Sequence, residues 1–110
     1  MSDAIVILCT CPDTAVARDL AGGLVTSGLA ACVNVLPEIR SIYRWHGELH
    51  EDPEVLLIVK STQARYAELE RWLVQRHPYD VPEVLALPVT GGAEPYLAWL
   101  TGQTTVDENQ

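Results

Sequence analysis

Positive charge is scarce in this sequence. Seven Lys and Arg residues stand against fifteen Asp and Glu, so the formal net charge at pH 7 is −8. A surface with that balance repels phosphate groups, and phosphate contacts supply most non-specific affinity for nucleic acid and for anionic membranes. The composition therefore predicts a protein whose partners do not include nucleic acid.

Long apolar segments are also absent. The longest uninterrupted apolar run is Ala4 to Cys9, far below the ~20 residues that a transmembrane helix needs. Asp3 stands where a secretory signal peptide would carry positive charge, and no suitable apolar region follows. We therefore expect no membrane insertion and a cytoplasmic location.

Cysteine is sparse and odd in number, with Cys9, Cys11 and Cys32 as the three residues. An odd count does not fit a disulfide framework, and in a reducing compartment such residues are buried thiols or metal ligands. Enzyme signatures such as G-x-S-x-G, a Gly-rich phosphate loop or H-E-x-x-H do not occur. A nucleophilic Cys9–His77 pair would need electropositive surroundings, which the net charge opposes. We expect a binding protein and not an enzyme.

The length of 110 residues fits a single domain, 1–110, with 48% hydrophobic residues. A chain of this size buries about two-thirds of its unfolded surface. It therefore needs no cofactor to fold.

Apolar periodicity and turn residues divide the chain into alternating strands and helices. Pro37 is expected at a bulge or a bend and Gly47-Glu48 at a hairpin turn. Asp13 and either Ser61 or Thr62 are expected at helix N-caps, and Pro78 should end a helix near Arg76. The Gly22-Gly23 pair inside the first helix can admit the close approach of another backbone. The predicted strands are 4–10, 30–35 with its continuation beyond Pro37 over 39–46, 49–59 and 83–87. The helices are 14–27, 62–76 and 96–100, and a polar tail begins at about 102. This β-α-β-β-α-β order predicts an α/β (α+β) fold, namely a ferredoxin-like split βαβ sandwich with a long hairpin and a short C-terminal helix.

The predicted sheet is apolar on both faces. Segments 4–9, 55–59 and 84–87 are apolar at consecutive positions, whereas a sheet with one wet face alternates. Both helices cover one face in this fold, so another subunit is the expected cover for the second. The alternative is that the C-terminal helix alone covers it, but about two turns of helix are too few for four strands.

Several local motifs are similar to one family. Segments 31–37 (ACVNVLP), 41–48 (SIYRWHGE) and 77–83 (HPYDVPE) resemble the CutA divalent-cation-tolerance proteins, and so do Cys9-Thr10 before Pro12-Asp13 and the closing segment 96–100. The resemblance runs from Ile5 to about Leu100. It implies a homotrimer of ferredoxin-like subunits, similar in architecture to the PII signalling proteins, with a role in tolerance of or response to copper and other divalent cations.

Soft donors are the candidates for a metal site. Thiolate and imidazole groups suit copper and zinc, and the chain offers Cys9, Cys11, His46, His50 and His77. His46 and His50 flank the predicted hairpin turn, where solvated histidines are the commoner outcome.

In the resembled family, metal binding is associated with the first-strand cysteine and a histidine pair just before a proline. Cys9 and His77 match that pattern, but Arg76 takes the place of the other histidine, and a guanidinium cannot ligate a metal. We expect weak binding of copper or zinc at Cys9 and His77, with Cys11 or a neighbouring subunit adding ligands.

A second group of residues is expected around a cleft between subunits: Trp45, Lys60, Tyr79 and Glu83, beside His77. Partly buried charges need partners or a ligand. One interpretation is a PII-like sensor that binds a small metabolite or anion there. The other is a structural ion pair with aromatic packing.

Overall fold

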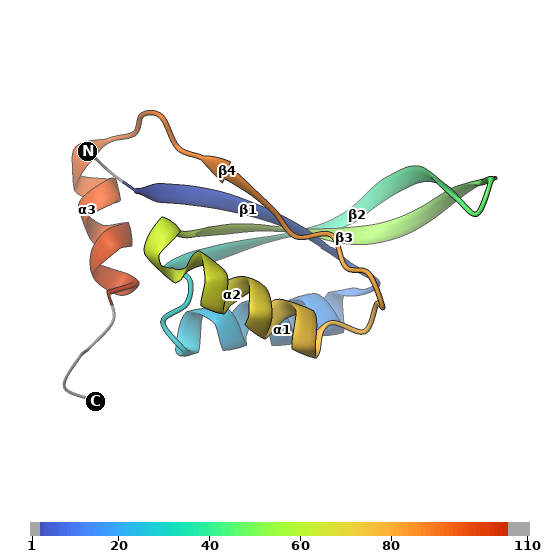
Figure 1. The fold of residues 1–110 in the computed structure, drawn as a ribbon, viewed down its shortest axis with the longest axis horizontal. Coiled ribbons are helices and arrows are strands. Elements are labelled where there is room, and N and C mark those ends of the chain that lie inside the picture. Colours follow the sequence, from blue (N-terminus) through green and yellow to red (C-terminus); the bar gives the residue numbers. More distant parts are fainter. Residues whose placement is uncertain (1–2, 106–110) are drawn as a thin grey trace.

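The computed structural model describes residues 3–105. In chain order the elements are β1 (Ala4–Cys11), α1 (Thr14–Thr26), β2 (Cys32–Trp45), β3 (Glu48–Thr62), α2 (Gln63–Arg76), β4 (Leu85–Pro88) and α3 (Glu94–Gln103). The four strands form one antiparallel sheet in the order β2-β3-β1-β4. This arrangement confirms the predicted ferredoxin-like fold, with α1 and α2 together on one face of the sheet (Figure 1).

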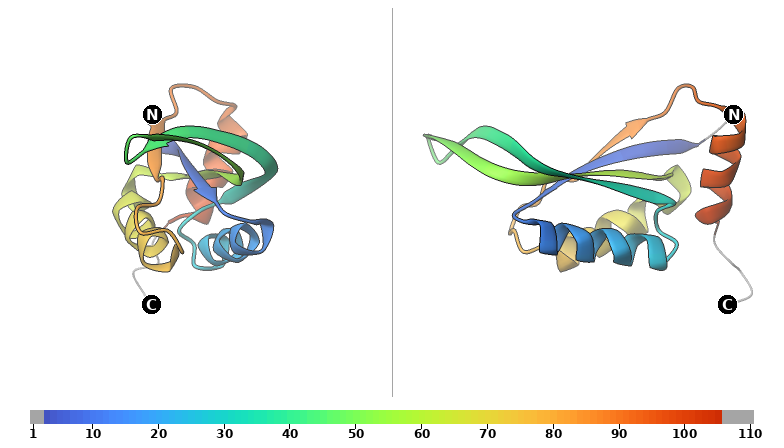
Figure 2. Two further views of the ribbon diagram at one scale, coloured as in Figure 1. Left: turned by 90° about the vertical axis from the view of Figure 1, so that its right-hand side faces the viewer. Right: turned by 180° about the vertical axis from the view of Figure 1, so that it is seen from behind.

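The hairpin of β2 and β3 projects beyond the rest of the subunit (Figures 1 and 2). β1 pairs with β3 only as far as Cys11 opposite Val55, so the outer part of the hairpin has no third strand beside it. Its turn lies at His46 and Gly47, with φ of 51° and 79°, one residue earlier than expected. Two successive positive φ values are typical of a type I′ turn, which matches the twist of a hairpin.

The predicted bulge at Pro37 is confirmed. The β2–β3 register shifts between Leu36 and Ile39, and Glu38 adopts a φ of 63°. Proline cannot donate to the ladder, so the strand bends there and continues on the other side of the irregularity.

The two long helices begin in different ways. The Asp13 side chain accepts a hydrogen bond of 2.8 Å from the backbone N–H of Val16 and caps α1, as predicted. Thr62 occupies the N-cap position of α2, but its side chain makes no capping hydrogen bond. Ser61 does not cap either, because its hydroxyl donates to the backbone oxygen of Leu29 at 2.6 Å.

The C-terminal third departs most from expectation. β4 starts at Leu85 and not at residue 83, because β1 pairs with it only over Ile5 to Leu8. α3 extends to Gln103, so the expected polar tail does not begin at 102, and its part from Val106 lies outside the described residues. None of the described helices is long and apolar enough to span a bilayer.

The core lies between the sheet and the helices α1 and α2. Its largest fully buried members come from alternate positions of β1 and β3, from the inner faces of both helices and from the loop after α1: Ile7, Cys9, Cys11, Leu24, Leu29, Leu57, Val59, Leu69 and Leu73. The intervening positions of the strands form the second face, on which Leu85 and Leu87 are exposed. α3 lies at the end of the sheet, where Leu100 packs on Ala4 and Ala31, and leaves that face uncovered (Figure 2).

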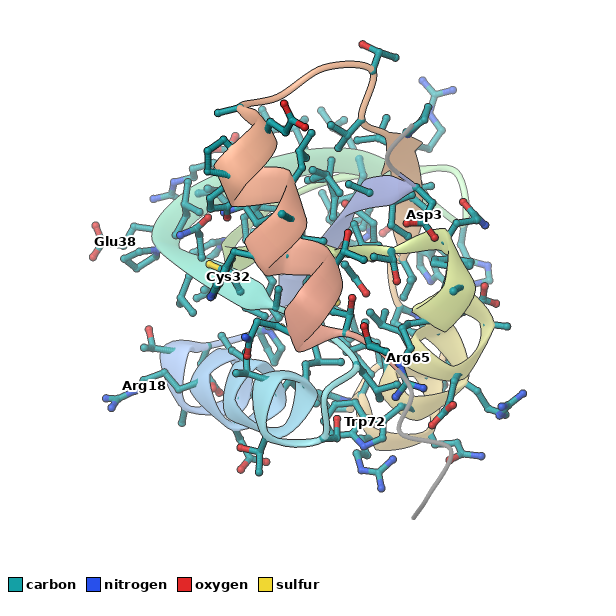
Figure 3. The ribbon with its side chains drawn as sticks, turned by 90° about the vertical axis from the view of Figure 1, so that its left-hand side faces the viewer. Asp3, Arg18, Cys32, Glu38, Arg65 and Trp72 are labelled. Carbon is teal, nitrogen blue, oxygen red and sulfur yellow. The ribbon has the colours of Figure 1, made fainter. Side chains whose placement is uncertain are left out.

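Gly23 permits a close contact between α1 and α2. A Cβ atom at Gly23 would lie 2.6 Å from two ring carbons of Trp72, whereas one at Gly22 would meet nothing within 4 Å. We expected the glycine pair to admit another backbone, but the neighbour is an aromatic side chain between the two helices (Figure 3).

Alanine substitutions at these two glycines should therefore have opposite effects. Gly22→Ala should raise the free energy of unfolding by about 0.5–1 kcal/mol, because it removes helix-interior glycine entropy. Gly23→Ala should lower it by about 1–3 kcal/mol, because Trp72 must move. Urea denaturation at one fixed chain concentration measures both, and equal stabilisation by the two substitutions would refute the contact.

Candidate functional site

Three side chains of the types that ligate metals meet at the end of β1. The sulfur atoms of Cys9 and Cys11 and an imidazole nitrogen of His77 lie within 4.8 Å of one another, and all three residues are buried. Cys9 and Cys11 are two residues apart on a strand, so both point to the helix-covered face. They are opposite Leu57 and Val55 of β3.

His77 reaches the thiols because α2 ends where it does. Pro78 disfavours helical geometry at the preceding residue, and His77 is extended, with φ of −72° and ψ of 139°. Its Nδ1 accepts a 3.1 Å hydrogen bond from the backbone N–H of Tyr79. Nε2 therefore carries the proton and donates to the backbone oxygen of Thr10 at 2.8 Å. These two bonds join the loop after α2 to β1.

The pKa values of the two thiols are shifted in opposite directions. A shared hydrogen bond with Cys11 raises the pKa of Cys9, and burial and the carboxylates of Glu83 and Glu54 raise it further. The same hydrogen bond lowers the pKa of Cys11, against opposing effects of burial and nearby carboxylates. The Cys9 sulfur also lies 3.8 Å from the backbone oxygen of Thr10. Cys11 is thus the thiol that ionises first.

This donor set fits a soft metal ion in type and number. Two thiolates and one imidazole suit copper or zinc, and the site brings together the predicted pair Cys9 and His77 with Cys11, which we had given a lesser role. Metal binding there must displace a thiol proton and one hydrogen bond of the His77 ring.

The other two histidines, and Arg76 at the position of the family's second histidine, lie elsewhere. The guanidinium of Arg76 lies over the Trp72 ring, 4.4 Å from its centroid, and its Nη1 is 3.4 Å from the backbone oxygen of Trp72. His50 stacks on Tyr43 at 5.3 Å between ring centroids. His46 meets the edge of Trp45. None of these three belongs to the Cys9–Cys11–His77 group.

A groove of about 740 Å³ lies beside the metal-ligating group. It forms where the projecting hairpin, the end of β1 and the loop after α2 face one another; we call it the hairpin groove. Its lining residues are Thr10, Pro12, Ser41, Ile42, Tyr43, Trp45, Asp52, Pro53, Glu54, Tyr79, Asp80, Val81 and Glu83.

Three of the four residues predicted for a cleft line the hairpin groove, namely Trp45, Tyr79 and Glu83. Lys60 does not, because it is paired with Val6 and Cys32 far along β3. Its ammonium group contacts the side-chain oxygen of Asn34. Within one subunit Lys60 thus lies apart from the other three, and the cleft between subunits stays a prediction.

Sequence reasoning missed the other polar groups of the groove. The Tyr79 hydroxyl donates to Glu54 at 2.8 Å and the Tyr43 hydroxyl donates to Asp52 at 2.5 Å. Burial and the hydrogen bond to Glu54 raise the pKa of Tyr79, and the hydrogen bond to Asp52 raises the pKa of Tyr43. The sequence signal that could have found Tyr43 is the alternation of side chains along a strand, which places residues 41, 43 and 45 on one face of the hairpin.

Comparison with known proteins gives one consistent result. Residues 5–103 match the family model described as CutA1 divalent ion tolerance protein. The divalent-cation tolerance protein CutA of Pectobacterium atrosepticum is 50% identical over 100 residues, which cover 91% of both chains. The solved Cut A1 structure from Thermus thermophilus has a TM-score of 0.90 at 47% identity, covering 93% of this chain and 99% of that one. CutA from Xylella fastidiosa has a TM-score of 0.92 at 36% identity, covering 94% and 100%.

The names of relatives differ in cellular compartment. A 45% identical relative from Arabidopsis thaliana is named chloroplastic, and a solved structure from Archaeoglobus fulgidus is titled periplasmic. The cytoplasmic location of this chain stays a prediction.

The two hydrogen bonds of the His77 ring should contribute to the free energy of unfolding. His77→Phe removes the ring's hydrogen bonds to the Thr10 carbonyl and from the Tyr79 N–H, so the free energy of unfolding should fall by about 2–4 kcal/mol. The neighbouring Arg76→Leu removes an exposed cation–π contact and a long hydrogen bond to the Trp72 carbonyl and should cost about 1 kcal/mol or less. Urea denaturation of both variants tests this, and similar losses would show that the His77 ring contributes little.

Proposed function

The chain belongs to the CutA1 divalent ion tolerance protein family, and from that premise we propose that it acts as a homotrimer in a metal-tolerance response. The proposed ligand is copper, as copper(I) or copper(II), or another divalent cation such as zinc. The observation that carries the metal part is the convergence of two thiols and an imidazole within 4.8 Å at Cys9, Cys11 and His77. Sulfur and nitrogen donors select copper and zinc over magnesium and calcium. The role is that of a binding protein.

The side chains of the proposed metal site have hydrogen-bond or packing partners within the protein even without a metal. Both ring nitrogens of His77 have hydrogen-bond partners, and the thiols of Cys9 and Cys11 belong to the apolar core. The fold therefore does not depend on the metal, in contrast to small domains in which a structural zinc supplies the folding energy.

Copper(I) affinity should depend on both thiols and on pH. Cys9→Ser and Cys11→Ser should each weaken binding by more than ~100-fold, since loss of an outer-shell group alone costs up to about that much. Because the pKa of Cys9 is raised, that thiol is protonated in the metal-free protein, and copper must displace its proton. Affinity should therefore rise with pH, by about tenfold per unit for each proton displaced. Anaerobic competition with a chromophoric chelator measures both effects.

Cys32→Ser is the matched control for these titrations. Cys32 is half-buried at the start of β2 and lies apart from the Cys9–Cys11–His77 group, so its loss should leave the copper affinity within about twofold of wild type. Unchanged affinity in Cys9→Ser and Cys11→Ser, or an equal loss in Cys32→Ser, would remove the proposed site.

The uncovered second face of the sheet supports the trimer. Leu8, Leu56 and Ile58 are half-buried there, and the exposed fractions of Leu85 and Leu87 are 57% and 47%. Apolar surface of this kind is stabilised by burial, at about 25 cal/mol per Å², and α3 does not cover it. The face supports association in general, and the number three comes from the family.

A charge on that face should disrupt the trimer. Leu87→Glu places a carboxylate in the proposed interface, where an unpaired buried charge costs several kcal/mol. The control is Val74→Glu, because Val74 has the same exposed fraction of 47% but lies on α2. Light scattering should give three chain masses for wild type and Val74→Glu and a smaller mass for Leu87→Glu. A monomeric wild type at micromolar concentration would contradict the proposal.

A second candidate function is recognition of a small molecule, and one observation favours it. The hairpin groove has the volume of a small-ligand site and is walled by aromatic and carboxylate side chains. An anion is a poor fit to that lining, because Lys60 is outside the groove. The chain would then act as a sensor in the manner of the PII-like proteins.

A further inference from the structure

We propose that the hairpin groove binds an organic polyammonium ligand, such as a linear polyamine. The proposal rests on the second candidate function above and names the chemical class of its ligand. It concerns a site separate from the Cys9–Cys11–His77 group, although Thr10 and Tyr79 connect the two.

The charge of the groove selects a cation. Its lining carries the carboxylates of Asp52, Glu54, Asp80 and Glu83, and the described residues that line it include no Lys, Arg or His. The salt bridge found among residues 3–105 joins Arg65 to Glu68, on α2, so no cationic side chain there pairs with these four carboxylates. A protein with a net charge of −8 further raises the local concentration of cations.

The carboxylates differ in how much of their hydrogen-bonding capacity is free. Glu54 and Asp52 each accept one hydrogen bond, from Tyr79 and Tyr43 respectively. The hydroxyls hold those two carboxylates in place and leave lone pairs for a ligand. Glu83 accepts no side-chain hydrogen bond from the described residues and is fully available to an ammonium group.

The walls of the groove suit alkylammonium groups. Tyr43, Trp45 and Tyr79 all line it, and aromatic faces attract ammonium groups through cation–π interaction. Trp45 is 52% exposed, so a large part of its ring is open to a ligand. Aromatic rings also cover the methylene segments between the ammonium groups of a polyamine.

The spacing of the carboxylates distinguishes a polyamine from a metal ion. Within residues 3–105, the Cys, His, Asp and Glu side chains whose ligand atoms gather in a group of three or more are Cys9, Cys11 and His77. The groove carboxylates do not converge in this way, so they do not form a cage for one hard divalent ion. Charges distributed along a groove match a ligand whose own charges are distributed.

Calorimetric titration of the intact, assembled protein with spermidine tests the proposal. Wild type should bind spermidine, and Glu83→Gln should weaken binding by about tenfold, because a charge-assisted hydrogen bond is lost. Trp45→Leu should weaken it by about three- to fivefold. Asp19→Asn changes the net charge equally at an exposed site on α1 and should leave the affinity within about twofold, because diffuse charge is screened.

Further titrations distinguish the polyammonium proposal from the metal proposal. Cys9→Ser should bind spermidine like wild type while losing copper, and neither citrate nor Mg²⁺ should displace spermidine at matched ionic strength. No spermidine binding, equal weakening in Asp19→Asn and Glu83→Gln, or displacement by Mg²⁺ would each overturn the polyammonium site. Copper affinity measured on the same samples then shows whether the metal site stands independently.

Discussion

The sheet has two apolar faces, and the chain supplies helices for one of them. β1 and β3 carry branched or long aliphatic side chains at consecutive positions, and α1 and α2 bury one set against Leu24, Leu69 and Leu73. That packing sets the direction of both helices, and hence the point at which α2 ends and the following loop crosses the end of β1. The other set lies half-buried or exposed on the second face, which α3 leaves uncovered, and the proposed trimer buries it.

The end of α2 has the largest functional consequences. His77 is placed there by Pro78, and its ring donates to the Thr10 carbonyl and accepts from the Tyr79 N–H. The first bond brings an imidazole next to the two thiols of β1. The second orients Tyr79, whose hydroxyl donates to Glu54 in the hairpin groove. The proposed metal site and the groove therefore meet at Thr10 and Tyr79, which both line the groove and are both hydrogen-bonded to His77.

Local chemistry was sufficient to predict most of the fold. Alternation and β-branching predicted the strands, Asp13 predicted the start of α1, Pro37 the bulge and Pro78 the end of α2. The errors came from contacts between segments far apart in the chain. The start of β4 depends on its pairing with β1, the close neighbour of Gly23 is Trp72 from α2, and Ser61 donates to Leu29 and does not cap a helix.

The same distinction applies to the candidate site. Cys9 and His77 came from a family resemblance, and Cys11 follows from strand alternation once β1 is known to continue to residue 11. The position of Lys60 relative to the groove of its own subunit depends on the sheet register, which the sequence alone does not supply. The grouping of the carboxylates Asp52, Glu54 and Asp80 in one groove could not be predicted, because the hairpin and the loop after α2 face one another only in the folded chain.

The coordination of bound copper tests the account most directly. X-ray absorption at the copper edge can be recorded on the Cys32→Ser protein loaded anaerobically with one equivalent of copper(I) per chain. The account predicts two sulfur neighbours and one imidazole nitrogen, from Cys9, Cys11 and His77. A spectrum with only oxygen and nitrogen neighbours would contradict it, because the metal would then lie away from the two thiols.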